Sequence, residues 1–139
     1  MKAKKFGNKF VLRIDRGEEI ASEIKKFCEK EEIFSGSVMG IGAVKGFTVR
    51  FFDPAAKEYR PKEFSGVFEI TSLVGNAATL GNEVYLHLHI TLSDENFNCF
   101  GGHLEKAIVG ATCEVVIEKF SGKLERKFSG EIGLNLLNL

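Results

Sequence analysis

The first quarter of the chain changes from strand-like to helix-like spacing of its apolar residues. Residues 10–14 form a short apolar run with charged or polar neighbours on both sides, which predicts a strand that ends at Asp15–Gly17. From Glu18 to about Glu32, apolar side chains recur every three or four positions while charged residues occupy the opposite face. Acidic residues lead this segment, as the helix dipole favours. The pattern predicts one amphipathic helix near the N-terminus.

The rest of the chain carries patterns typical of strands and turns. Two paired strands are predicted at 37–44 and 46–52, followed by a turn at Asp53 and Pro54. Further strands are predicted around Tyr59 and at 67–73, 84–92, 112–120 and 124–128. One helix and many short strands, without alternating helices, predict an α+β fold with a mostly antiparallel β-sheet. No linker divides the chain, so residues 1–139 are expected to form a single domain.

Composition agrees with one globular domain. The 139 residues, 44% hydrophobic and 27% charged, suffice for one continuous core. Thirteen Phe against two Tyr and no Trp predict a core filled largely by Phe rings. Three cysteines without C-x-x-C spacing argue against a disulfide framework and favour a reducing, cytoplasmic compartment. No apolar stretch is long enough to span a bilayer, so no membrane association is expected.

The charge balance bears on nucleic-acid binding. Nineteen Lys and Arg offset nineteen Asp and Glu, whereas proteins that rely on phosphate contacts usually carry a basic excess. The one basic stretch, Lys2 to Lys9, is interpreted as a solvated tail. The sequence therefore argues against strong binding to nucleic acid.

A glycine-rich segment, Gly40 to Gly46, invites comparison with dinucleotide-binding loops. Such a loop needs a strand before the glycines and a helix after them, so that pyrophosphate meets the helix N-terminus. Here the following residues, 47–52, are aromatic and β-branched, which predicts a strand, and the glycine spacing differs by one. We interpret the glycines as allowing a sharp turn or close packing between strands.

The three histidines of the chain are its most informative chemical feature. In residues 84–92 apolar and polar side chains alternate, so one face of the predicted strand is an apolar wall and the other carries His87 and His89. Two histidines at this spacing project side by side and can ligate one metal ion. A polar strand face without any metal is the alternative.

The third histidine, His103, follows Gly101 and Gly102, fourteen residues after His89. We predict a turn at the glycines and a hairpin-like return that places His103 over the face carrying the pair. Three imidazoles with an open fourth position are the ligand set of a catalytic zinc site. The predicted cofactor is a divalent metal ion, with Zn²⁺ favoured, although imidazole also suits iron, copper and nickel.

Glu69 is the candidate for chemistry beside the metal. It lies between apolar neighbours on a predicted strand, and it is proposed either as a general base or as a fourth ligand. Asp94 and Glu105 are less distinctive carboxylates. An ordinary solvated carboxylate is the alternative interpretation for each.

Several short motifs occur together in a fixed order. They include Gly66-x-Phe-Glu-Ile70, Leu86-His-Leu-His89, Gly101-Gly-His-Leu104 and Thr112-x-Glu-Val-Val-Ile117. From about Lys9 to Phe120 this series resembles the plants-and-prokaryotes-conserved (PPC) domain, also called domain of unknown function 296 or the PD1-like DNA-binding domain, in its stand-alone prokaryotic form.

The resemblance implies an α+β fold, a homotrimer, and metal ligation by histidines like His87, His89 and His103. In plants the domain accompanies AT-hooks that bind A·T-rich DNA, but this chain has no Arg-Gly-Arg-Pro core. Weak or absent DNA binding is therefore expected. Two functions remain open: a trimeric metal-binding protein that takes a small-molecule ligand at the metal, enzymatic or not, and a DNA- or protein-binding regulatory module whose histidines are structural.

Overall fold

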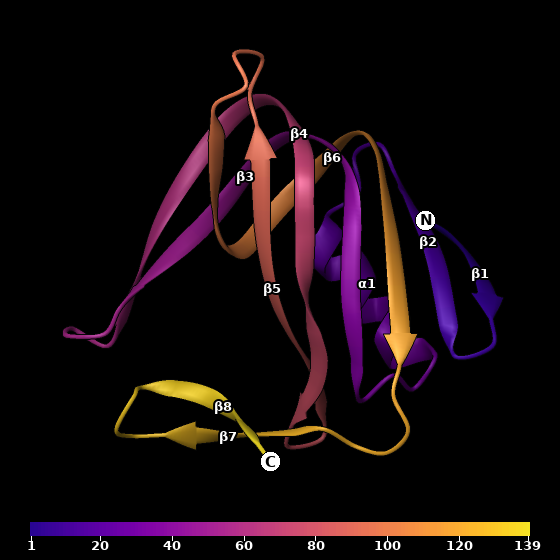
Figure 1. The fold of residues 1–139 in the computed structure, drawn as a ribbon, viewed down its shortest axis with the longest axis vertical. Helices are drawn as coiled ribbons and strands as arrows, with labels where there is room; N and C mark the ends of the chain where they lie inside the picture. The colour runs from indigo at the N-terminus through magenta and orange to yellow at the C-terminus, as the bar shows by residue number, and fades with distance from the viewer.

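The computed structural model describes residues 1–139 as eight strands and one helix (Figure 1). In chain order these are β1 (Lys2–Phe6), β2 (Lys9–Asp15), α1 (Ile20–Lys30), β3 (Gly36–Asp53), β4 (Glu58–Leu80), β5 (Glu83–Ser93), β6 (Cys99–Lys119), β7 (Glu125–Ser129) and β8 (Leu134–Asn138). The predicted α+β fold, with one helix near the N-terminus and a mostly antiparallel sheet, is confirmed. The one helix is too short to cross a membrane.

The sheet closes on itself through its four longest strands. β3 pairs with both β4 and β6, while β5 pairs with β4 on one side and with the first residues of β6 on the other. β1 and β2 extend the sheet beyond β6. The β7–β8 hairpin lies across the end of the sheet where β4 turns into β5 (Figure 1), and it joins β4 through one parallel bridge between Thr79 and Glu125.

The core lies between the sheet and α1. The helix turns Ile20, Ile24 and Phe27 inward, and Glu19 caps it by accepting hydrogen bonds from the amides of Ala21 and Ser22. The alternation predicted for residues 84–92 is confirmed, because Val84, Leu88, Ile90 and Leu92 are all buried. The other face of β5 is left for polar side chains.

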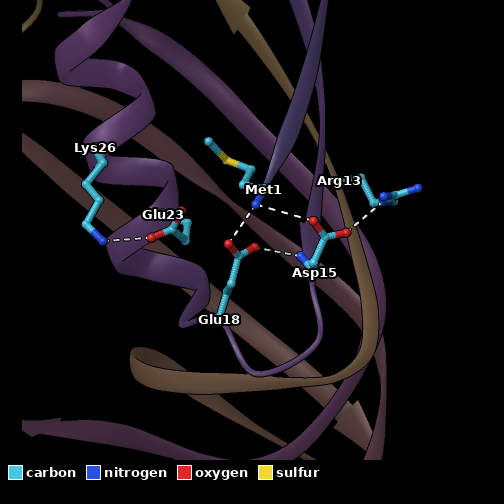
Figure 2. A network of polar contacts seen from close by, with 6 residues as sticks. All are labelled: Met1, Arg13, Asp15, Glu18, Glu23 and Lys26. Carbon is cyan, nitrogen blue, oxygen red and sulfur yellow. Dashed lines mark hydrogen bonds and ion pairs between the residues drawn. The ribbon is translucent and has the colours of Figure 1, made fainter.

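The basic N-terminal stretch is a strand in this structure, so its interpretation as a solvated tail is wrong. β1 pairs along its whole length with β2. Its start is also held by charge, because the amino group of Met1 lies 2.6 Å from a carboxylate oxygen of Glu18 and 3.4 Å from one of Asp15 (Figure 2). The lysine side chains are exposed on β1 and β2, and the pairing of the two strands holds only their backbone in place.

The segments 37–44 and 46–52 are consecutive parts of β3 and are not paired with each other. The chain stays extended through the glycines, with register shifts at Gly40–Gly42 and Val44–Gly46. Gly42 has φ +152°, and a Cβ there would lie 2.7 Å from Cα of Cys113 on β6. These glycines therefore allow close strand packing, as interpreted, and no helix follows them to form a dinucleotide loop.

The prediction of a Phe-filled core is wrong. Of the thirteen Phe, only Phe10, Phe27, Phe47 and Phe68 are buried, and the core consists mainly of Ile, Leu and Val. Exposed strand faces and turns carry most of the remaining rings. Composition states how many Phe residues the chain has, but not which of them are buried. Burial of each ring depends on the sheet face that it occupies, and that is set by long-range strand pairing.

Candidate metal centre

The structure brings all three histidines together on one face of the sheet. His87 and His89 lie two residues apart on β5, so their side chains project to the same side. His103 on β6 is the direct cross-strand partner of His89. A hairpin-like return of the chain between residues 93 and 99 creates this pairing, as the sequence predicted.

The three rings form a nearly equilateral triangle. Their centroids are 5.2 Å apart for His87–His89 and His87–His103, and 5.5 Å apart for His89–His103. One ring nitrogen from each residue lies within 4.8 Å of the other two. Ligands of one tetrahedral zinc are about 3.4 Å apart, given Zn–N bonds of about 2.0–2.1 Å. To share one zinc, the nitrogens would therefore have to approach one another by up to about 1.4 Å.

His103 lies inside a strand, and the prediction of a turn at its preceding glycines is wrong. Gly101 and Gly102 pair with Thr91 and Ile90 across the β5–β6 ladder. A Cβ on Gly101 would lie 2.7 Å from the carbonyl oxygen of Ile90, and one on Gly102 would lie 3.1 Å from that of Arg50. The glycines therefore let three strands approach closely, and the turn itself occupies residues 94–98.

The surroundings of His87 and His103 favour the neutral imidazole, which is the form that binds a metal. Burial is the main cause that lowers the pKa of His103 to about 4, helped by repulsion from His87 and His89. Burial also lowers the pKa of His87, with the charge of Arg126 as the second cause. In addition, Nδ1 of His103 is buried without a hydrogen-bond partner.

Three residues that the sequence did not single out surround the cluster. The ring of Tyr59 on β4 lies 5.2 Å from the ring of His103. Arg126 on β7 places Nη2 3.4 Å from Nδ1 of His87, and its guanidinium lies over the ring of Tyr85 at 5.1 Å. Tyr85 was detectable in the sequence, because it precedes His87 by two residues on the polar face of β5.

Of the candidate carboxylates, only Glu105 lies near a histidine, because it follows His103 by two residues on β6. Glu69 is exposed on β4 opposite Ser93, four residues along β5 from His89, which is about 13 Å at 3.3 Å per residue. Glu105 forms an ion pair with Arg50, which lowers the pKa of the Glu105 carboxyl. Asp94 accepts hydrogen bonds from the amides of Asn96 and Asn98 and so shapes the turn before β6.

Solved structures of similar proteins share the whole fold. A candidate DNA-binding protein from Bacteroides thetaiotaomicron matches with a TM-score of 0.96 and 39% identity, over 99% of this chain and 96% of that one. A metal-containing protein from Archaeoglobus fulgidus matches with a TM-score of 0.90 and 34% identity over all of both chains. A plant- and prokaryote-conserved protein from Pyrococcus horikoshii matches with a TM-score of 0.87 and 32% identity, over 99% and 94%.

A likeness also exists to a curated protein of different length. The bifunctional protein GlmU of a Synechococcus strain is 27% identical over 122 residues, which are 86% of this chain. This chain spans only 18% of that relative's length.

The family is defined by a match over most of the sequence. Residues 1–121 match the Plants and Prokaryotes Conserved (PCC) domain, so all elements from β1 to β6 lie within the match and the β7–β8 hairpin follows it. The resemblance noted in the ordered motifs is thereby confirmed. The chain belongs to the Plants and Prokaryotes Conserved domain family.

Proposed function

We propose that this protein binds one divalent metal ion, Zn²⁺ by preference, through His87, His89 and His103, and that it offers the fourth position to a small molecule. The observation that carries the proposal is the convergence of three ring nitrogens within 4.8 Å of one another. The metal content of the Archaeoglobus fulgidus protein, which is 34% identical, supports it.

The donor set fits zinc. Three imidazoles leave one of four tetrahedral positions open, as in catalytic zinc sites. The buried, unpaired Nδ1 of His103 would gain a partner from metal ligation, directly or through reorientation of the ring. When bound, the ion would act as a Lewis acid or lower the pKa of a bound water. The protein's own part is to hold three imidazoles in place on two paired strands.

The outer face of the sheet supports assembly as a homotrimer, the state that the family resemblance implies. Met39 and Ile41 on β3 are 59% and 58% exposed, although both are large apolar residues. Direct cross-strand pairing connects an apolar row that runs Val11, Val116, Met39 and Val74 and ends at His89. An apolar strip of this kind is typical of a protein–protein interface, so a neighbouring subunit would lie next to the metal site.

Glu69 enters this proposal only through the assembly. Within one chain it lies about 13 Å along the sheet from His89, too far to be a ligand or a base. A role in catalysis would therefore require Glu69 of a neighbouring subunit. Replacement by Gln should leave the metal content unchanged if Glu69 acts as a base.

A second candidate function is a regulatory module that contacts DNA or protein. The likeness to a candidate DNA-binding protein favours it. The nineteen basic and nineteen acidic residues balance, so the chain as a whole does not attract phosphate. We therefore expect its binding to DNA to be weak.

Metal analysis of protein purified without a polyhistidine tag tests the proposal. Wild-type protein dialysed against zinc should retain about one ion per chain. Loss of a residue that only hydrogen-bonds to a metal ligand lowers metal affinity roughly 10–100-fold. His89→Ala removes a ligand itself, so it should lower zinc affinity by more than that. Glu83→Ala is the matched control, because Glu83 is an exposed residue at the start of the same strand, four residues before His87. Equal uptake by wild type and His89→Ala would refute the site.

A further inference from the structure

A small cavity beside the histidines is not accounted for by metal ligation alone. Its volume is about 70 Å³, and its wall combines His87 and His103 with Tyr59, Tyr85 and Arg126. Residues 134–136 of β8 complete the lining, which contains no Asp or Glu. Pockets that hold drug-sized molecules measure roughly 300–1,000 Å³, so this cavity suits a ligand of only a few heavy atoms.

Arg126 is the one cationic side chain in that wall, and no acid neutralises it. Nη1 donates to the carbonyl oxygen of Asn135 at 2.8 Å, and Nη2 donates to Oδ1 of Asn76 at 2.7 Å. The guanidinium also lies over the ring of Tyr85 at 5.1 Å and next to the imidazole of His87, while Nε is buried without a partner. The guanidinium is therefore fixed in position but is neither charge-compensated nor fully hydrogen-bonded.

The burial of this group makes its lack of an ion pair significant. Arg126 is only 9% exposed, and arginines are rarely so buried unless they are paired. A buried charge without a counter-charge is costly, and the cost is removed when a ligand supplies the opposite charge. The planar fork of guanidinium donors matches an oxyanion such as a carboxylate or a phosphate.

The C-terminal hairpin holds Arg126 over the site. Arg126 pairs with Leu137 in the β7–β8 ladder, and the hairpin joins β4 at Thr79. On its far side, Nζ of Lys57 donates to the carbonyl oxygen of Gly130 at 2.8 Å, which ties the β3–β4 turn to the β7–β8 turn. The hairpin follows residues 1–121, which match the family domain, so Arg126 lies outside that match and the three histidines lie within it.

We infer that Arg126 makes this cavity a receptor for a small carboxylate, which binds with one oxygen at the open position of the metal and with its charge against the guanidinium. The inference rests on the proposed function, because the open position belongs to the metal. A carboxylate carries one negative charge, which the one cationic side chain of this wall balances, whereas a phosphate carries a greater charge and more oxygens. The ligand class is therefore a carboxylate of a few heavy atoms.

Titration of cobalt-loaded protein with acetate tests this assignment without any enzymatic assay. The visible absorption of Co²⁺ in place of zinc responds to the ligand in the fourth position. Acetate should alter the spectrum of wild-type protein at a concentration at least tenfold lower than its neutral analogue acetamide. Arg126→Gln should raise the acetate midpoint at least about tenfold, and Arg126→Lys should give an intermediate value, because it keeps the charge but loses the fork.

Arg13→Gln is the matched control, since Arg13 lies on β2 and pairs with Asp15, and it should leave the midpoint unchanged. Failure of wild-type protein to take up Co²⁺ would refute the metal site itself. Normal Co²⁺ uptake with the same acetate midpoint in wild type and Arg126→Gln would overturn the role of Arg126 alone. If circular dichroism shows that Arg126→Gln does not fold, the midpoint of Arg126→Lys decides. Inorganic phosphate acting at a lower concentration than acetate would overturn the carboxylate assignment.

Discussion

Gly75 is the position where one added methyl group should damage both the fold and the site. It lies on β4 opposite Leu88, one residue before the cross-strand partner of His87. A Cβ at this position would lie 2.9 Å from the carbonyl carbon of His87 and 2.9 Å from Cα of Leu88, and closer still to the carbonyl oxygen of His87. Carbon atoms in contact are normally about 3.5–4.0 Å apart. β4 and β5 must therefore separate by more than half an ångström in Gly75→Ala.

The obstacle is backbone, so no side-chain rotation relieves it. Overpacking of this kind costs typically about 1–3 kcal/mol, and we expect the upper end here. With an unfolding entropy of about 2.1 cal/mol/K per residue, a chain of 139 residues should lose about 10 °C in Tm for 3 kcal/mol. Because the displaced backbone carries His87, zinc affinity should fall as well.

Gly130→Ala is the matched control for that experiment. A Cβ on Gly130 meets nothing within 4 Å, and its backbone is not in the left-handed region. Its Tm should stay the same or rise slightly, because alanine restricts the unfolded chain. Thermal unfolding followed by circular dichroism compares the two variants. A Tm for Gly75→Ala within about 2 °C of wild type would refute the account of close approach between β4 and β5.

Three further predictions concern pH, assembly and DNA. The folded pKa of His103 is about 4 and that of His87 is also lowered, so at acidic pH the unfolded chain binds protons that the folded chain excludes. The Tm of metal-free protein should therefore decrease as the pH is lowered from about 6.5 to 4. His103→Gln should make this decrease smaller, and an equal decrease in both proteins would contradict the prediction. Light scattering of wild-type protein should give a molar mass of about 46 kDa, which is three chains of 15.4 kDa. Met39→Lys should lower this mass toward that of the monomer. A monomeric wild type would refute the trimer. Gel shifts should show at best micromolar, salt-sensitive duplex binding, and nanomolar affinity that survives moderate salt would overturn that expectation.

The sequence predicted the part of the site that depends on local periodicity. Alternation along β5 has a period of two residues, so the burial of Leu88 and the exposure of His89 on the opposite face follow from the order of residues alone. The return of His103 needed one further assumption, a hairpin between neighbouring strands. That assumption was correct, although the turn lies at residues 94–98 and not at the glycines.

Features that depend on distant pairing could not be predicted in the same way. Arg126 reaches His87 across 39 positions of sequence, through a hairpin whose docking on β4 has no local signature. The exposed position of Glu69 depends on how β4 pairs with β5 and β3, whereas its apolar neighbours in sequence suggested only a strand. The sequence predicts two strands, at 37–44 and 46–52, where the structure has the single strand β3, because glycine is typical of turns as well as of close strand contacts.

X-ray absorption at the zinc edge, measured on wild-type protein loaded with one zinc per chain, tests the central claim most directly. The account predicts the scattering of three imidazoles with Zn–N distances of about 2.0–2.1 Å and one further light atom. His89→Ala loaded at the same concentration should lose one imidazole or lose the metal. A spectrum with sulfur neighbours at about 2.3 Å, or one without three imidazoles, would contradict a metal centre formed by His87, His89 and His103.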